Sequence, residues 1–223
     1  MDDSSIACFD PRSDASPLGD DEVHVWLSTV ADATPRALAA AARAVLERLL
    51  CDYANCSNVP PRIERGPHGK PFAPELPQLE FNLSHAGRHV LLAFAHGQAL
   101  GIDLEAEQRR LALGEIAQRF FAPAEARALA RLPLPLQRSA FLQLWTRKEA
   151  VLKALGVGIS FGLDRVEFVL DETGTAGALR AIAPEAGSVA EWTLHRLDPA
   201  PGMLGALAWR GPARRVRTFA LRA

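Results

Sequence analysis

Two carboxylates stand close together in the segment GIDLE, which covers residues 101–105. Asp103 and Glu105 are two positions apart, so on a β-strand both side chains would point to the same face. Ile102 and Leu104 alternate with them and would point to the other face, into a core. Two carboxylates on one face repel each other unless a cation, a proton or water relieves them. The pair is therefore either a solvated sheet face or part of a cation-binding site.

A second charged group lies in WTRKEAVLKA, residues 145–154. Trp145, Glu149 and Lys153 are spaced by four and would form one stripe of a helix, with Lys148 beside it. The stripe is either an aromatic core residue followed by a surface ion pair, or a carboxylate and two ammonium groups that face a ligand. Next to an acidic strand the second arrangement suits a magnesium–diphosphate site, because Mg²⁺ takes few protein carboxylates and completes its octahedron with water and phosphate oxygens.

Two further segments carry groups that could contact a phosphate. In FNLSHAG (81–87) a strand runs into a turn at Ser84 and His85, and in GPHGKPF (66–72) a loop presents Lys70. Each is also compatible with an ordinary turn or surface loop. Lysine and arginine together number 25, yet only three are lysines, and all three lie in the segments described here. A compact ammonium group is favoured at these positions over a planar guanidinium.

The composition limits the class of protein. The chain has 223 residues, of which 48% are hydrophobic and 23% charged, with a formal net charge of −1. These values are typical of a globular protein and argue against a nucleic-acid binder. An acidic start and the lack of any long apolar run predict a cytoplasmic protein that does not bind membranes. Cys8, Cys51 and Cys56 are too few and wrongly spaced for a disulfide framework or a zinc site, and we expect free thiols.

The hydrophobic periodicity predicts an α+β protein. Residues 1–21 are expected to be a flexible leader, 22–105 an N-terminal lobe and 106–223 a C-terminal lobe. The expected helices cover 35–50, 113–121, 123–132 and 136–155. The expected strands cover 23–30, 79–84, 88–95, 98–105, 164–170, 191–197, 203–209 and 214–221, and the second to fourth of these are predicted to form an antiparallel meander. Each lobe would then be a long helix packed on an antiparallel sheet, giving two similar, pseudo-symmetric lobes.

In this order and at these distances, the segments resemble the Sfp-type 4′-phosphopantetheinyl transferases. The matching segments are GKPF (69–72), FNLSHAG (81–87), GIDLE (101–105), RFF followed by Glu125 (119–125), and LWTRKEAVLKALG (144–156). The chain length fits this two-lobed type better than the single-lobed, trimeric type. The resemblance implies a monomer with its active site between the lobes.

The resemblance also implies a reaction. Such enzymes move the 4′-phosphopantetheine arm of coenzyme A (CoA) to a serine of an apo acyl or peptidyl carrier protein and release 3′,5′-ADP. Asp103, Glu105 and Glu149 would hold Mg²⁺, or Mn²⁺, at the diphosphate. Glu149 would also be the general base, directly or through a metal-bound water, and Lys153 and Lys148 would stabilise charge on the diphosphate. The carrier and its pathway stay open.

The remaining matches concern CoA binding. Ser84 and His85 would contact CoA phosphates and Lys70 the nucleotide end, while Glu125 would lie near the site. Trp145 is explained about equally well by contact with the site and by core packing.

The front end departs from the family pattern. The basic helix that usually follows the first strand is missing, since only four residues separate Val30 from Pro35. Arg36 and Arg43 are therefore the expected anchors of the CoA 3′-phosphate. Basic residues after the acidic strand would steer an acidic carrier to the site; the candidates are Arg110, Arg127 and Arg131.

Two other functions remain compatible with these residues. One is a different Mg²⁺-dependent phosphoryl or nucleotidyl transferase, which would share the acidic strand but would have no joint use for Lys70, Ser84 and His85. The other is an inactive homologue that binds CoA or the carrier. A lost metal-binding carboxylate would be expected in that case, and all three are present.

Overall fold

The computed structural model describes residues 5–31, 34–56, 59–108 and 112–221. The helices are α1 (Pro35–Ala54), α2 (Leu113–Phe120), α3 (Pro123–Arg131) and α4 (Leu134–Leu155). The strands are β1 (Asp10–Arg12), β2 (Glu22–Thr29), β3 (Glu64–Arg65), β4 (Pro71–Phe72), β5 (Leu79–Ala86), β6 (His89–His96), β7 (Leu100–Ala106), β8 (Val166–Leu170), β9 (Ala176–Ile182), β10 (Trp192–Leu197), β11 (Met203–Arg210) and β12 (Arg215–Leu221). The α+β class is confirmed.

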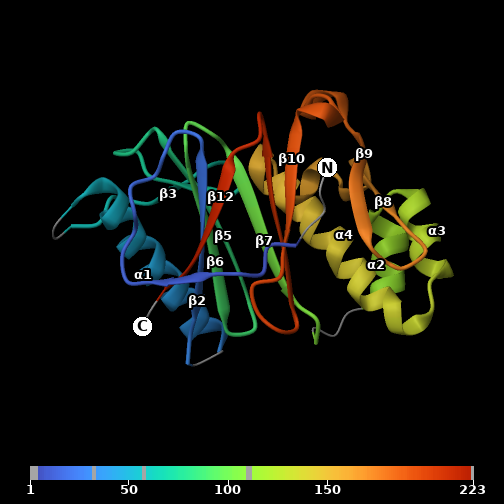
Figure 1. Cartoon of the computed structure of the whole chain (residues 1–223). Coiled ribbons are helices and arrows are strands. Elements are labelled where there is room, and N and C mark those ends of the chain that lie inside the picture. The colour runs from blue at the N-terminus through green and yellow to red at the C-terminus, as the bar shows by residue number, and fades with distance from the viewer. Residues whose placement is uncertain (1–4, 32–33, 57–58, 109–111, 222–223) are drawn as a thin grey trace.

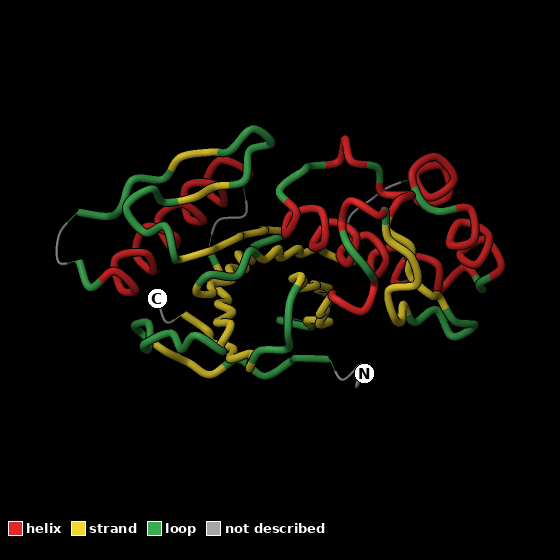
Figure 2. The backbone as a smooth tube through the Cα atoms, turned by 90° about the horizontal axis from the view of Figure 1, so that it is seen from above, coloured by secondary structure: helices red, strands yellow, loops and turns green. Residues whose placement is uncertain are grey.

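The main elements stack in four layers, in which α1 covers one sheet and α4 covers another (Figure 1). The first sheet has the strand order β1-β12-β2-β6-β5, and the second has the order β10-β11-β7. Seen from above, the strands of the two larger sheets lie between α1 on one side and the remaining helices on the other (Figure 2). The two sheets therefore pack face to face, with α1 and α4 on their outer faces.

Three apolar clusters hold these layers together. One face of the first sheet, with Trp26 and Phe94, packs on α1, and its opposite face packs on Ile102 and Leu104 of the second sheet. The far face of the second sheet then packs on α4, which is buried over most of its surface by β8, β9, α2 and α3. The strand alternation predicted for GIDLE is thus confirmed, because Ile102 and Leu104 enter the core between the sheets.

Local sequence explains where the two long helices begin and end. Thr34 caps α1 by accepting a hydrogen bond from the Ala37 backbone N–H, and Pro35 occupies the first helical position. The helix buries Leu38, Ala42, Leu46 and Leu49 at helical spacing. Helix α4 ends at Gly156, whose left-handed backbone (φ 71°) closes the last turn.

The sheets differ from the prediction in their pairing. Strand β7 pairs with β11 in the second sheet instead of completing a meander with β6, and β12 inserts parallel to β2 in the first sheet. The expected lobes 22–105 and 106–223 therefore exchange strands, and the first sheet is mixed instead of antiparallel. Short-range turn signals predict a hairpin, but they carry no information about a partner more than a hundred residues away.

The described part of the leader is packed instead of flexible. Strand β1 pairs in parallel with β12, and Ile6 bridges to Leu197 on β10. Phe9 packs against the core between the sheets, and Leu18 packs against the core under α1. Because residues 1–21 are mostly polar, their composition did not predict that these few apolar side chains would pack against the cores. Residues 1–4 lie outside the described part.

A buried polar chain ties the end of α1 to the first sheet. Trp26 Nε1 donates to the Tyr53 hydroxyl (2.8 Å), which lies 2.8 Å from His24 Nδ1, and His24 Nε2 lies 3.2 Å from Glu22. An indole N–H can only donate, so the Tyr53 hydroxyl keeps its proton for His24. Burial lowers the pKa of His24, and Arg217 nearby acts in the same direction, while Glu22 opposes the shift.

Because His24 belongs to this buried polar network, we expect the stability of the protein to depend on pH. The folded pKa of His24 lies below the unfolded value of 6.5, so the unfolded chain binds the proton more readily. The free energy of unfolding should fall as the pH drops below about 6.5, and His24→Gln should flatten that dependence. Urea unfolding across the pH range measures it, with exposed His68→Gln as the control. Parallel profiles for the wild type and His24→Gln would contradict the assignment.

Candidate active site

A cavity of about 400 Å³ lies where three segments meet: the loop from Arg65 to Pro71, the end of β5 and the last turns of α4. Its polar lining consists of Arg65, His68, Lys70, Asn82, Ser84, His85, Glu149 and Lys153. Lys70, Ser84, His85, Glu149 and Lys153, all predicted from the sequence, are brought together here. The mixture of cationic groups and a carboxylate suits an anionic ligand, alone or with a cation.

The position of α4 over β7 is set by a missing side chain. A Cβ atom on Gly101 would lie 2.0 Å from the carbonyl oxygen of Ala150 and 2.4 Å from the backbone nitrogen of Ala154. Only glycine permits this approach of strand to helix backbone. The contact places Asp103, two residues further along the same face of β7, beside Lys153.

Asp103 is held by one of its carboxylate oxygens. It is 5% exposed, and Oδ1 accepts hydrogen bonds from Lys153 Nζ (2.7 Å) and Ser84 Oγ (2.9 Å). Lys153 also donates to the carbonyl oxygen of Ile102 (3.1 Å). Asp103 Oδ2 is buried and makes no hydrogen bond within the described residues. A buried carboxylate oxygen of this kind fits a bound cation.

The three predicted metal ligands are not gathered around one point. Glu149 lines the cavity, while Asp103 (5% exposed) and Glu105 (7% exposed) lie on β7 and are not among its lining residues. Over the described ranges, no three His, Cys, Asp or Glu side chains are arranged to hold a metal ion. Asp103 and Glu149 fit a Mg²⁺ that takes its other ligands from water and phosphate, which is the usual arrangement for this ion.

Lys70 fastens the loop to the site. Its Nζ donates to the carbonyl oxygens of Leu100 (3.0 Å) and Ala154 (3.4 Å), and its stem lies 3.7 Å from the Cβ position of Gly156. Burial lowers the pKa of Lys70, opposed by Glu80. An ammonium group has three N–H donors, so one is left to bind a ligand. Lys70 therefore has a structural role, and its contact with a ligand stays a prediction.

Three further residues of the cavity were missed from the sequence. Arg65 and His68 lie in the Lys70 loop, and Arg65 Nη1 donates to the carbonyl oxygen of Gly69 (2.8 Å). Asn82 accepts a hydrogen bond from the Ile102 backbone N–H (2.9 Å) and joins β5 to β7 across the two sheets. Their nearness to Lys70 and Ser84 in the sequence was the available signal.

The structure corrects the prediction for Lys148. Its side chain is fully buried on the far side of α4, where Nζ donates to the carbonyl oxygens of Leu163 (2.8 Å) and Val166 and pairs with Glu125 (2.7 Å). Neighbouring helical residues point about 100° apart, so a helix that directs residue 149 into the cavity directs residue 148 elsewhere. Lys148 does not face the cavity.

Glu125 belongs to the same buried pair and not to the cavity. Its carboxylate accepts hydrogen bonds from the backbone N–H groups of Ala122 (3.0 Å) and Phe168 (2.8 Å). Burial raises the pKa of Glu125 and lowers that of Lys148, and each residue's charge opposes the shift of the other. The expectation that Glu125 lies near the site is wrong.

Trp145 and the predicted arginine anchors also lie elsewhere. The Trp145 ring stacks on Phe141 (5.8 Å between centroids), so core packing explains it. Arg36 and Arg43 project from α1 and do not line the cavity, and Arg43 pairs with Glu47 (2.8 Å) with its side chain 73% exposed. The prediction that they anchor the 3′-phosphate is not supported.

Comparison with known proteins gives the family. A model described as the 4′-phosphopantetheinyl transferase superfamily matches residues 99–197. The chain is 40% identical over 146 residues to the 4′-phosphopantetheinyl transferase psf-1 of Bacillus pumilus, covering 66% of this chain and 59% of that protein. It is 39% identical over 113 residues to Sfp of Bacillus subtilis, covering 51% and 49%.

The match to HetI of Nostoc sp. extends further, with 33% identity over 174 residues that cover 77% of this chain and 70% of that protein. The chain belongs to the 4′-phosphopantetheinyl transferase family. It spans about half to three-fifths of the length of several of the curated relatives, at 59%, 61% and 49% for three of them. Within the described residues, no helix is long and apolar enough to cross a bilayer.

In this 4′-phosphopantetheinyl transferase family member, Gly101→Ala should disturb the contact of α4 with β7. The added methyl group must displace helix backbone, which we expect to cost about 1–3 kcal/mol of unfolding free energy or more. Gly114→Ala in α2 is the control, because its Cβ would meet no atom within 4 Å. Denaturant unfolding measures both, and equal stability of the two variants would refute the role of Gly101.

Variants of Lys148 and Lys153 should differ in their effect on stability. Lys148→Met leaves Glu125 as an uncompensated buried charge and should cost about 3–5 kcal/mol of unfolding free energy. Adding Glu125→Gln should restore part of that loss, because the amide oxygen can still accept backbone hydrogen bonds. Lys153→Met removes one donor from the buried Asp103, but Ser84 still donates to that carboxylate and the Lys153 side chain is 27% exposed, so we expect a smaller loss than in Lys148→Met. A stable Lys148→Met protein would overturn the core assignment.

Proposed function

We propose that this chain transfers the 4′-phosphopantetheine group of CoA to a serine hydroxyl of an apo acyl or peptidyl carrier protein and releases 3′,5′-ADP. The observation that carries the proposal is the hydrogen-bonded group Ser84–Asp103–Lys153 beside Glu149 in a cavity rich in basic side chains. The names of the related proteins agree with it. A carrier serine and the CoA diphosphate could meet in this cavity.

The basic side chains would bind the anionic parts of CoA. Lys153 is fixed by Asp103 and by the carbonyl oxygen of Ile102, so its ammonium group is oriented before substrate arrives. A donor held in place stabilises charge that develops on a phosphate oxygen without having to reorganise. His85 would contact the same phosphates. Arg65, His68 and Lys70, at the loop end of the cavity, would bind the nucleotide part, in the place first expected for Arg36 and Arg43.

A magnesium ion fits between the carboxylates and the substrate. Asp103 and Glu149 would be its protein ligands in this arrangement, and Glu105, on the same strand face, remains a proposed third ligand. Bound there, Mg²⁺ would neutralise the diphosphate and make the phosphorus more electrophilic. Ser84 supports Asp103 by donating its hydroxyl to Oδ1, which leaves Oδ2 without a hydrogen bond from the described residues.

Glu149 is the proposed general base. The oxygen of the carrier serine forms a bond to the phosphorus of the pantetheine phosphate, and the bond from that phosphorus to 3′,5′-ADP breaks. The serine proton passes to the carboxylate of Glu149, while Lys153 donates a hydrogen bond to the departing phosphate. A base must lie within hydrogen-bond reach of the proton it takes, and Glu149 lies at the cavity wall.

The partner is proposed to be an acidic carrier. Arg127 and Arg131 are exposed on α3 and would steer it by charge. Arg110, the third candidate, lies outside the described residues. A monomer, as the family resemblance implies, remains the proposed oligomeric state.

Intact-mass spectrometry of an apo carrier with this protein, CoA and Mg²⁺ tests the function. The carrier should gain one phosphopantetheine, and EDTA should abolish the gain. Asp103→Asn and Glu149→Gln should slow transfer by at least about 100-fold, as loss of a charge-stabilising group does. Exposed Glu172→Gln on the β8–β9 turn is the control.

The outcomes distinguish the alternatives. If Glu105→Gln raises the Mg²⁺ concentration needed for half-maximal rate as Asp103→Asn does, Glu105 is a metal ligand. If that concentration is unchanged, Glu105 is not a metal ligand. CoA binding without any transfer across carriers of several pathways would indicate an inactive binder. Transfer that persists in EDTA would show that the reaction does not need a metal ion.

A further inference from the structure

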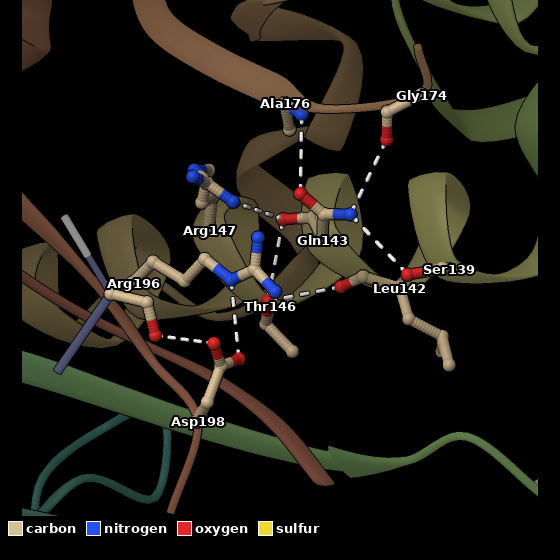
Figure 3. A network of polar contacts seen from close by, with 10 residues as sticks. Ser139, Leu142, Gln143, Thr146, Arg147, Gly174, Ala176, Arg196 and Asp198 are labelled. Atoms are coloured by element: carbon tan, nitrogen blue, oxygen red, sulfur yellow. Dashed lines mark hydrogen bonds and ion pairs between the residues drawn. The ribbon is translucent and has the colours of Figure 1, made fainter. Parts of the chain in front are cut away.

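The two long helices are attached to their neighbours in different ways. Helix α4 is tied to the start of β9 by Gln143, which accepts a hydrogen bond from the Ala176 backbone N–H (3.2 Å) and donates to the Gly174 carbonyl oxygen (3.3 Å) (Figure 3). The last turn of α1 is held by Tyr53, whose hydroxyl accepts a hydrogen bond from Trp26 (2.8 Å). Two of the three cysteines of the chain flank this tyrosine, and both are free thiols.

The backbone at the end of α1 brings Cys51 and Cys56 together. Asn55 follows the last helical residue in the left-handed conformation (φ 51°) and turns the chain back. The Asn55 backbone N–H donates to the Asp52 carbonyl oxygen (3.2 Å), and the Cys56 backbone N–H donates to the Cys51 carbonyl oxygen (3.0 Å). These are the two hydrogen bonds of a Schellman motif, in which side chains at the positions of Cys51 and Cys56 commonly touch.

The two thiols interact with each other. A hydrogen bond to Cys56 raises the pKa of Cys51 to about 11, and burial and the negative charges of Asp52 and Glu47 act in the same direction. Cys51 therefore keeps its proton and donates it to the Cys56 sulfur. Both side chains are half-buried, so a small reagent can still reach them. Two sulfur atoms within hydrogen-bond distance need only a small side-chain rotation to form an S–S bond of about 2.05 Å.

We propose that Cys51 and Cys56 are a reversible dithiol–disulfide pair that closes the end of α1 covalently. With a small-molecule disulfide such as oxidised glutathione as the oxidant, the Cys56 thiolate attacks one glutathione sulfur and releases one glutathione thiolate. The Cys51 sulfur then attacks the Cys56 sulfur, forms the S–S bond and releases the second glutathione. Each departing thiolate takes up one of the two cysteine protons. Two protein thiols are thus oxidised to a disulfide while one glutathione disulfide is reduced to two thiols.

The disulfide would stabilise the fold without altering the candidate active site. It would close the same short loop that the Schellman hydrogen bonds already close, so it would restrict the unfolded chain more than the folded one. None of the described residues that line the active-site cavity comes from 51–56. Cys8 is exposed and lies on a different segment, which makes it an internal control for thiol chemistry that needs no partner.

Equilibration of the full chain with mixtures of reduced and oxidised glutathione tests the proposal. After acid quenching, alkylation and trypsin digestion, both cysteines lie in the peptide 49–62 and Cys8 lies in the peptide 1–12. Peptide 49–62 should become lighter by two hydrogen atoms and resist alkylation, whereas Cys8 should take up glutathione. The equilibrium constant for this disulfide should be at least about tenfold larger in the folded protein than in urea, which corresponds to a rise in Tm of about 3–6 °C on oxidation.

A matched pair of variants tests the role of the helix end. Asn55→Gly adopts the left-handed conformation without strain and should keep the equilibrium constant of the folded protein. Asn55→Val opposes that conformation and should lower the constant by about fivefold or more. Stable glutathione adducts on both Cys51 and Cys56, equal constants in the folded and urea-unfolded protein, or equal constants for the two Asn55 variants would overturn the proposal.

Discussion

The direct contact of β7 with α4 at Gly101 is the constraint on which the site depends. Because no side chain separates strand from helix there, the helix backbone approaches the strand at one fixed height. That height places Lys153 against Asp103 and places Glu149 one turn earlier, at the cavity wall. The carboxylate on the strand and the ammonium on the helix are then positioned by backbone geometry, with little side-chain freedom left to adjust.

Helix α4 is buried over most of its surface, so its neighbouring residues serve separate purposes. Glu149 and Lys153 face the cavity, Lys148 pairs with Glu125 in the core, and Arg147 is buried at 3% exposure. The buried pair is a costly feature unless every donor and acceptor is used. Here the ammonium group of Lys148 has three acceptors, and the Glu125 carboxylate also receives two backbone N–H groups.

Sequence periodicity predicted the parts of this arrangement that are local. The spacing of four predicted that Glu149 and Lys153 share one helix face, and strand alternation predicted that Asp103 and Ile102 point to opposite faces of their strand. The predictions that failed depend on packing against distant segments. The face of α4 that carries Lys148 is covered by residues far away in the sequence, and the parallel insertion of β12 beside β2 has no signal in either segment. The arginine anchors failed because α1 covers the opposite face of its sheet, away from β7.

The scarcity of lysine in this arginine-rich chain has a structural explanation. Each of the three lysines donates to backbone carbonyl oxygens: Lys70 to Leu100 and Ala154, Lys148 to Leu163 and Val166, and Lys153 to Ile102. The two carbonyls bound by Lys70 converge on one ammonium group, and the two bound by Lys148 converge on another. A compact ammonium with three rotatable donors can satisfy two such carbonyls, whereas a planar guanidinium fork cannot without moving the backbone. The same property suits Lys153 to hold a phosphate oxygen, because the donors that fix its position leave its charge facing the cavity.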